Sequence, residues 1–162
     1  MPNRRIAIDD PTREDVRALL ATHLSFTRAT SPPEDVHALD VDGLTSPDVS
    51  FYSLREDDVL LGVGALRELD SRHGEIKSMH TTATARGLGV GRSLLSHLLH
   101  TARARGYSRV SLETGTMEEF APARRLYLAA GFEVCPPFND YPESPNSVCM
   151  TLSLQGKTQA RA

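Results

Sequence analysis

The stretch Arg86-Gly87-Leu88-Gly89-Val90-Gly91-Arg92 places three glycines within five residues, where a strand-like segment meets a helical one. Glycine accepts a positive φ and lets another group come close to the backbone. Residues 93–105 contain no Gly or Pro, so we expect the glycines at the start of a helix. Unpaired N–H groups and the positive end of the helix dipole bind anions there. The stretch therefore predicts a pyrophosphate-binding turn; a turn that only lets strand and helix pack closely is the alternative.

The chain before the glycine turn reads as a strand, two helices and three further strands. The ranges are a strand at 4–9, a helix from Asp10-Pro11-Thr12 to a break at 30–33, a short helix at 34–44, and strands at 49–55, 59–69 and 75–82. Turns are predicted at 56–58 and 71–74. We expect the strands at 49–55 and 59–69 to form an antiparallel hairpin, although Gly62 and Gly64 interrupt the second strand.

The chain after the glycine turn alternates between helices and strands. The ranges are a helix at 93–105 ended by Gly106, a strand at 109–112, a helix at 121–130 ended by Gly131, a short strand at 132–134, a proline-rich loop at 136–145 and a strand at 147–154. On the second helix, Ala123, Leu126, Tyr127 and Ala130 are expected on one face. The strand, glycine turn, helix and strand together predict a crossover unit, which joins parallel strands.

The composition excludes several classes of protein. The 162 residues suit one domain, here 1–154, followed by a polar tail at 155–162 that we expect to be disordered. A net charge of −3 gives no electrostatic case for a nucleic acid partner or a membrane surface. The N-terminus lacks the apolar segment of a secretion signal, so a cytoplasmic location is expected. Cys135 and Cys149 lack a CxxC spacing and are expected as reduced thiols, and no His/Cys cluster indicates a metal site.

Two common phosphate-binding motifs fit the glycine stretch poorly. A P-loop requires Gly-Lys-Ser/Thr at its end, which is absent. A dinucleotide-binding turn requires a third glycine where Arg92 stands, and it opens its fold rather than following several antiparallel strands.

The stretch does fit the pattern R/Q-x-x-G-x-G/A through Arg86, Gly89 and Gly91, and there it resembles the acetyl-coenzyme A motif of the GNAT acyltransferases. A second signature, A-x-x-L-Y-x-x-x-G-F, is matched over residues 123–132. Three short stretches, at 79–81, 113–115 and 145–151, also resemble a subgroup of small bacterial GNAT proteins. The resemblance covers about residues 4–154.

The resemblance implies the fold and the reaction. The expected fold is α/β, or α+β with a mixed sheet: a mostly antiparallel sheet of six or seven strands, about four helices, and two strands that splay apart at the cofactor cleft. The expected reaction is transfer of acetyl from acetyl-coenzyme A to a primary amine, directly and with both substrates bound. We expect a small-molecule acceptor, with a peptide or protein amine as the alternative. The alternative from another functional class is a non-catalytic module that binds acyl-coenzyme A. The resemblance also implies a possible homodimer, because GNAT proteins are often dimers.

The resemblance also assigns cofactor-binding residues. The backbone from about Leu88 to Arg92 would donate hydrogen bonds to the pyrophosphate, and the end of the preceding strand would pair with the pantetheine arm as a peptide pairs with a strand edge. The cofactor-binding set is Met79, His80, Thr81, Arg86, Gly87, Leu88, Gly89, Val90, Gly91 and Arg92.

Two residues are predicted to be catalytic. Tyr127 matches the family tyrosine near the thioester sulfur, where a phenol can pass its proton to the departing thiolate; a purely structural place in the core is the alternative. Glu75 lies on the strand before the glycine turn and is the candidate base for the acceptor amine. Its alternative is a partly exposed carboxylate paired with Lys77 or an arginine. His80 and Glu113 are reserve candidates for the base.

The sequence departs from the family pattern at one cofactor contact. Many members have Asn seven residues before the tyrosine, and Phe120 stands there. Thr114 or Thr116 could supply the missing contact. Residues 31–37 and 139–146 are the candidates for acceptor specificity, and both are also ordinary turn-forming sequences.

Overall fold

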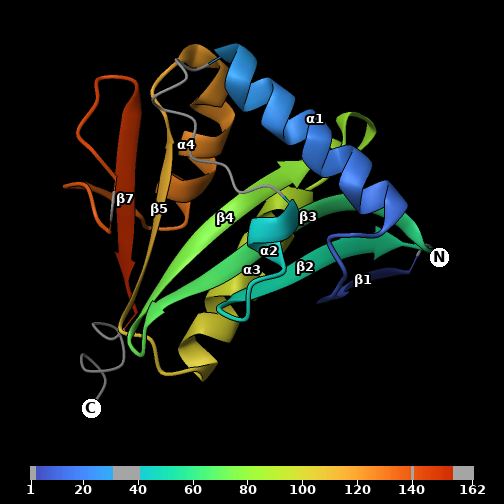
Figure 1. Cartoon of the computed structure of the whole chain (residues 1–162), viewed down its shortest axis with the longest axis horizontal. Helices are drawn as coiled ribbons and strands as arrows, with labels where there is room; N and C mark the ends of the chain where they lie inside the picture. The colour runs from blue at the N-terminus through green and yellow to red at the C-terminus, as the bar shows by residue number, and fades with distance from the viewer. Residues whose placement is uncertain (1–2, 31–40, 140, 155–162) are drawn as a thin grey trace.

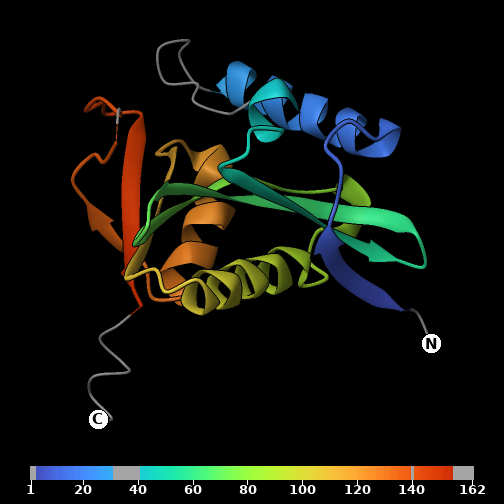
Figure 2. The same cartoon turned by 60° about the horizontal axis from the view of Figure 1, so that its bottom comes forward.

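The computed structural model describes residues 3–30, 41–139 and 141–154. A seven-stranded sheet forms the central layer, in the order β1-β2-β3-β4-β5-β7-β6. Helices α1 and α2 lie on one face of the sheet, and α3 and α4 lie on the other (Figures 1 and 2). Among the described strands, β4 and β5 are the pair that runs parallel, as neighbours joined by α3, and the other pairs are antiparallel. The predicted fold class is therefore confirmed.

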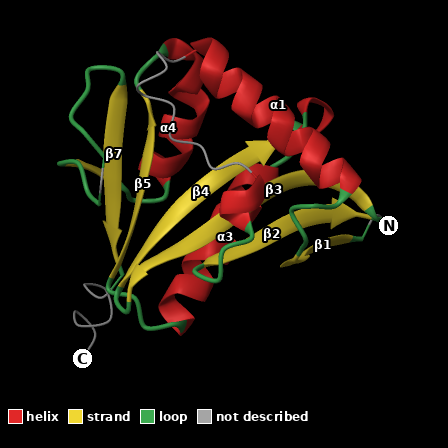
Figure 3. Cartoon of the chain, viewed as in Figure 1, coloured by secondary structure: helices red, strands yellow, loops and turns green. Residues whose placement is uncertain are grey.

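The elements follow the predicted order (Figure 3). Their bounds are β1 Arg4–Ile8, α1 Glu14–Thr30, α2 Val41–Leu44, β2 Val49–Glu56, β3 Val59–Asp70, β4 His73–Thr81, α3 Val90–Ala104, β5 Arg109–Gly115, α4 Ala121–Ala129, β6 Glu133–Cys135 and β7 Ser147–Ser153. Short 3₁₀ turns at Ala83–Ala85 and Glu118–Phe120 precede α3 and α4. Of the predicted helix at 34–44, residues 34–40 lie outside the described residues.

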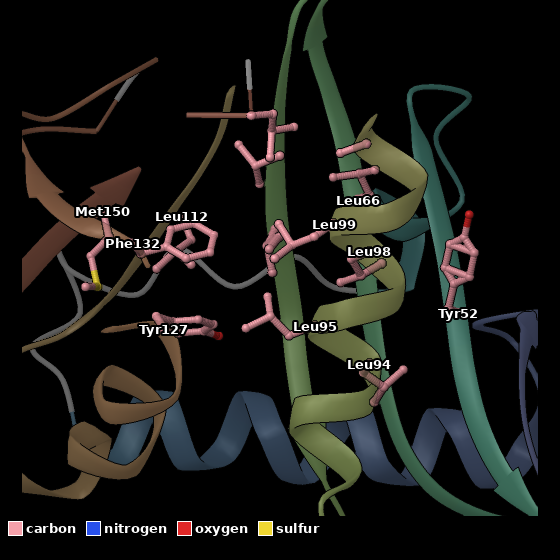
Figure 4. Packing of buried hydrophobic residues seen from close by; sticks show 14 of the residues in the cluster. Tyr52, Leu66, Leu94, Leu95, Leu98, Leu99, Leu112, Tyr127, Phe132 and Met150 are labelled. Atoms are coloured by element: carbon pink, nitrogen blue, oxygen red, sulfur yellow. The ribbon is translucent and has the colours of Figure 1, made fainter. Parts of the chain in front are cut away.

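Leucines of α3 form the centre of the larger core. Leu94, Leu95 and Leu98 are buried and point toward the strands, and the core continues to Phe132 and Met150 beside α4 (Figure 4). Gly106 ends α3 as predicted: its φ is +82°, and the next N–H, that of Tyr107, bonds back to Ala102 O at 3.1 Å. A second core lies between α1 and the opposite face of β2 and β3. Because both faces of these central strands are covered, they are apolar on both sides.

Two glycines of β3 do not interrupt the strand, contrary to the sequence interpretation. A Cβ on Gly64 would lie 2.6 Å from Met79 Sδ, and a Cβ on Gly62 would lie 2.7 Å from Val90 Cγ1. Both distances are closer than real contacts allow. The glycines therefore make room for β4 and for the start of α3.

The predicted turn at 71–74 is wrong in its second half, because β4 begins at His73. Gly74 is a strand residue whose missing side chain makes room for a ring: a Cβ there would lie 2.8 Å from Tyr107 Cε2. The expectation for Ala130 is also wrong. It follows the last residue of α4 and is exposed, while Tyr127 is buried.

Candidate active site

A cavity opens where two parallel strands part. The pairing of β4 with β5 covers only three positions and ends at Glu75 opposite Ser111. Beyond that point the strands diverge, as Figure 1 shows, and a cavity of about 690 Å³ lies between them and extends to the glycine turn. That volume is typical of small-molecule sites. The predicted splaying of the strands is therefore present.

A bulge in β4 shapes the edge of the cavity. The register of β3 and β4 shifts between Val63 and Ala65, and Ser78 has a φ of +58°. Such bulges bend a strand and redirect its side chains. The residues that follow, Met79, His80 and Thr81, are half-buried and line the cavity. The sequence reasoning placed these three at the cofactor, and the bulge had no sequence signal.

The glycine turn has the conformation of an anion-binding helix start. Gly87 and Gly89 have φ of +81° and +79°, and Gly89 is the N-cap of α3, where no side chain caps the helix. The first N–H groups of α3 are thus not satisfied by a capping side chain. Gly91 differs: its φ is not positive, and a Cβ there would lie 3.4 Å from Leu126 Cδ2. Because 3.4 Å is an ordinary van der Waals contact, neither the backbone conformation nor the available space requires glycine at position 91, which lies in the wall of the cavity.

Nine of the ten predicted cofactor-binding residues line the cavity, and Leu88 does not. Leu88 is 54% exposed, and its N–H bonds to Ala85 O at 3.3 Å. Its carbonyl oxygen accepts a hydrogen bond from Arg4 Nη1 at 2.9 Å. Leu88 therefore anchors the turn to β1. Sequence reasoning gave no role to Arg4, which is 84 residues away.

Tyr127 lies in the core, as the structural alternative predicted, and its catalytic role stays a prediction. Its ring is buried in the core, in edge contact with Phe132 at 5.8 Å between centroids (Figure 4). It also lines the cavity. Burial raises the pKa of its hydroxyl, so the phenol keeps its proton at neutral pH.

Glu75 is fully buried, so the alternative of a partly exposed carboxylate is wrong. The expected ion pairing is present, with Lys77 Nζ 3.6 Å from Oε2 and Arg67 Nη1 4.0 Å from Oε1. Oε2 also accepts a hydrogen bond from the hydroxyl of Tyr141. Lys77 and Tyr141 line the cavity, and Glu75 does not. The predicted base therefore lies behind these two side chains.

The two reserve candidates for the base also line the cavity. His80 Nδ1 lies 3.1 Å from Nδ1 of His23 on α1. Burial lowers the pKa of His80 to about 4, with Arg86 adding to the effect. Glu113 on β5 accepts a hydrogen bond from Ser147 Oγ at 2.6 Å.

Phe120, which stands where many family members have asparagine, lines the cavity. Its ring lies in edge contact with Phe26 of α1, 5.2 Å between centroids, and both rings line the cavity. Of the two threonines considered as replacements for the family asparagine, Thr114 lines the cavity. Thr116 instead donates a hydrogen bond to Pro145 O at 2.7 Å.

The predicted acceptor segments are only partly described. Residues 31–37 lie outside the described residues. Within 139–146, Tyr141 is the described residue that lines the cavity. His23, Phe26 and Lys77 were not predicted as cavity residues. Lys77 could have been predicted as a neighbour of the site, because it lies two residues after Glu75 on β4 and therefore on the same side of the strand.

Comparison with known proteins identifies the family. The profile of the Acetyltransferase (GNAT) family matches residues 14–132. The chain is 51% identical over 149 residues to the uncharacterized N-acetyltransferase YsnE of Bacillus subtilis, which covers 92% of this chain and 99% of YsnE. It is 46% identical over 149 residues to the uncharacterized N-acetyltransferase YedL of Escherichia coli, covering 92% and 94% of the two chains. A crystal structure of a Klebsiella pneumoniae protein classed with the acyl-CoA N-acyltransferases superposes with a TM-score of 0.79, at 27% identity and 93% and 97% coverage.

The chain therefore belongs to the GNAT acetyltransferase family. It is an N-acetyltransferase whose acetyl donor is acetyl-coenzyme A, as the sequence predicted. Within the described part of the chain, no helix is both long and apolar enough to cross a membrane. The same residues contain no group of three or more His, Cys, Asp or Glu side chains that could hold a metal ion.

Proposed function

We propose that this enzyme transfers acetyl from acetyl-coenzyme A directly to the primary amine of a small molecule, with both substrates bound together. The observation that carries the proposal is the parting of β4 and β5 beyond Glu75, above a cavity that reaches the glycine turn. The cavity joins an anion-binding helix start to a set of polar and aromatic side chains. That combination suits a long cofactor at one end and a small acceptor at the other.

The residues present fit the donor. The open N-terminus of α3 after Gly89 would hold the pyrophosphate, with Arg86 and Arg92 supplying positive charge beside it. The unpaired edge of β4 at residues 79–81 would hold the pantetheine amides, as a strand edge holds a peptide. When bound, the cofactor supplies the acetyl thioester; the chain supplies the orientation.

Two side chains would handle the protons. Tyr127 keeps its proton at neutral pH and would give it to the sulfur that leaves. Glu75 would be the final acceptor of the amine proton, because an alkyl amine with a pKa of about 10.4 must lose a proton to react near pH 7. The role of Tyr127 is supported by its match to the family tyrosine and by its place in the cavity wall, and the role of Glu75 by its contacts with Lys77 and Tyr141, which line the cavity.

The walls of the cavity favour a small acceptor over a peptide. Phe26 and Phe120, which are in edge contact with each other, line the cavity, and so does Tyr141 of the β6–β7 loop. These aromatic side chains suit an amine with an apolar body. A peptide or protein amine is the second candidate for the acceptor.

Two measurements test the function. Titration calorimetry with acetyl-coenzyme A and with coenzyme A measures binding of the donor, and a thiol-release assay measures turnover over a panel of primary amines and short peptides. We expect donor binding and turnover of at least one small amine. Turnover of peptides alone would replace the small-molecule acceptor with a peptide. Binding with no turnover would favour a non-catalytic module, and no binding would overturn the proposed function.

A further inference from the structure

The buried carboxylate of Glu75 is connected to the cavity through two side chains that line it, Tyr141 by a hydrogen bond and Lys77 by an ion pair at 3.6 Å. Its Oε2 accepts a hydrogen bond from the hydroxyl of Tyr141. Tyr141 lines the cavity, and Glu75 does not. The two residues are 66 positions apart in the chain. Glu75 Oε1, on the other side, has no hydrogen-bond partner among the described residues. A base in this position needs an intermediary if it is to receive a proton from an amine in the cavity.

We propose that Tyr141 is a further catalytic residue, which passes the proton of the acceptor amine to Glu75. This inference rests on the proposed function. In the step, the N–H bond of the amine breaks and its proton goes to Tyr141 Oη. At the same time the Tyr141 O–H proton moves to Glu75 Oε2. The amine nitrogen keeps the electron pair with which it bonds to the acetyl carbon. The carbon–sulfur bond then breaks, the sulfur leaves with the electrons of that bond and takes the proton of Tyr127, and the second proton that the nitrogen loses on forming the amide replaces it on Tyr127. Glu75 gives its proton back through Tyr141 to water after the product leaves.

Lys77 supports this transfer from a fixed place. Its Nζ donates a hydrogen bond to Tyr141 Oη at 2.8 Å and lies 3.6 Å from Glu75 Oε2. Negative charge that develops on the phenol oxygen during the transfer would be stabilised by this cation. Lys77 is 8% exposed, so the interaction is little screened by solvent. Lys77 is thus a positioning residue for Tyr141.

The ring of Tyr141 is held by its neighbours. Phe138 is buried and packs against it with 5.1 Å between centroids, and Lys77 Nζ lies 5.4 Å from the ring centroid. Removing only the hydroxyl would keep these contacts. The Tyr141→Phe variant therefore separates the proton relay from the packing of the loop.

The histidine beside the cavity is a weaker candidate for this step. His80 already shares its Nδ1 with Nδ1 of His23 on α1. Tyr141 is instead hydrogen-bonded directly to the buried carboxyl group of Glu75. The relay is therefore assigned to Tyr141 and Glu75.

The experiment compares Tyr141→Phe, Glu75→Gln and the double variant with the wild type. Each enzyme is tested by thiol release with the small amine of the panel that the wild type acetylates fastest. We expect each single variant to lower kcat about 100-fold, with little change in the affinity for acetyl-coenzyme A. The double variant should be no slower than the slower single variant, because both residues serve one transfer. If the losses of kcat in the two single variants multiplied in the double variant, or if Tyr141→Phe kept the wild-type kcat, the relay would be overturned.

A matched control is available outside the cavity. Tyr107 also donates its hydroxyl to a glutamate, Glu68 Oε1, at 2.7 Å, and it does not line the cavity. Tyr107→Phe should leave kcat unchanged. If Glu75→Gln does not fold, Glu75→Asp keeps the charge and withdraws the carboxylate from Tyr141, and it should lower kcat as Tyr141→Phe does.

A second readout distinguishes catalysis from structure. An acceptor whose amine is already neutral at pH 7 needs less help from a base, so the loss caused by Tyr141→Phe should shrink with acceptors of lower pKa. An equal loss for all acceptors would indicate a structural role and overturn the inference. If the wild type itself acetylates no amine of the panel, the proposed function fails, which is a different result from a slow variant beside an active wild type.

Discussion

The Nδ1 atoms of His23 and His80 lie 3.1 Å apart and join α1 to the end of β4 beside the cavity. Two imidazole nitrogens at this distance share one proton, so one ring donates and the other accepts. Burial lowers the pKa of both rings to about 4; His80 and Lys77 add to the effect at His23, and Arg86 adds to it at His80. Both histidines are therefore neutral at pH 7, and the contact is a hydrogen bond rather than a charge repulsion.

This pair predicts a loss of stability in mild acid. Between pH 6.5, the ordinary histidine value, and pH 4, the unfolded chain binds more protons at these positions than the folded chain. The free energy of unfolding is therefore highest above pH 6.5 and falls as the pH drops toward 4, by up to about 3 kcal/mol for each ring. Urea denaturation at a series of pH values measures the slope.

The His23→Gln variant isolates this effect from the titration of carboxylates. We expect it to be less stable than the wild type at pH 7.5 and to approach the wild type at pH 4.5, because the desolvated imidazole is gone. If the free energies of unfolding of the two proteins fell in parallel between pH 7.5 and pH 4.5, the histidine pair would not titrate in this pH range. His100→Gln on α3, whose His100 is exposed, is the control and should leave the slope unchanged.

A substitution in the glycine turn should selectively weaken the binding of the acetyl donor. Gly89 has a φ of +79°, and alanine in that region costs about 1 kcal/mol. Gly89→Ala should lower the melting temperature by a few degrees and weaken acetyl-coenzyme A binding about tenfold, because the N–H groups at the start of α3 would be displaced. Calorimetric titration and thermal melts measure the two effects.

Gly106→Ala is the matched control for Gly89→Ala. Gly106 has a φ of +82° at the other end of the same helix and does not line the cavity. The two variants should melt at similar temperatures, and only Gly89→Ala should bind the donor more weakly. Equal donor affinities in the two variants would contradict a pyrophosphate site at the turn.

Local features of this fold could be predicted from the sequence, because their causes are local. The left-handed glycines of the turn and the tyrosine on α4 follow from short spacings that one helix or one turn imposes. The ends of strands were harder to predict where a glycine can serve either in a turn or in close packing. Gly74 reads as a turn residue, and only the ring of Tyr107 above it explains why it lies inside a strand.

The acceptor side of the site depends on contacts that spacing along the chain does not reveal. His23 meets His80 across 57 residues, and Lys77 meets Tyr141 across 64. These contacts exist because β4 and β5 diverge, and because α1 and the β6–β7 loop both reach the cavity that results. Periodicity predicts which face a residue lies on but not which distant loop that face meets.

Tyr127 predicts an effect on turnover without an effect on binding. Tyr127→Phe keeps the ring and its edge contact with Phe132, so the fold and the affinity for acetyl-coenzyme A should not change. The proton for the sulfur is lost, and kcat should fall about 100-fold. Thiol-release kinetics and calorimetry measure these two quantities. A wild-type kcat would leave Tyr127 with its place in the core and no role as the acid.

The two cysteines predict that no acyl-enzyme forms. Cys135 and Cys149 face each other in the register of β6 and β7, and both are free thiols. Burial raises the pKa of Cys135 and raises that of Cys149 to about 11, so neither is a thiolate at pH 7. Neither lines the cavity beside β4. The Cys135→Ala, Cys149→Ala double variant should keep kcat within about twofold, because nucleophilic catalysis by a thiol requires its thiolate.

The same pair allows a direct search for the intermediate. Mass spectrometry of the wild type after incubation with acetyl-coenzyme A alone should show no acetylated cysteine. The double variant must first be shown to melt cooperatively and to bind acetyl-coenzyme A as the wild type does, because Cys149 is buried and its loss leaves a small cavity. If such an intact variant had lost its turnover, a cysteine would carry the acetyl group and transfer would not be direct.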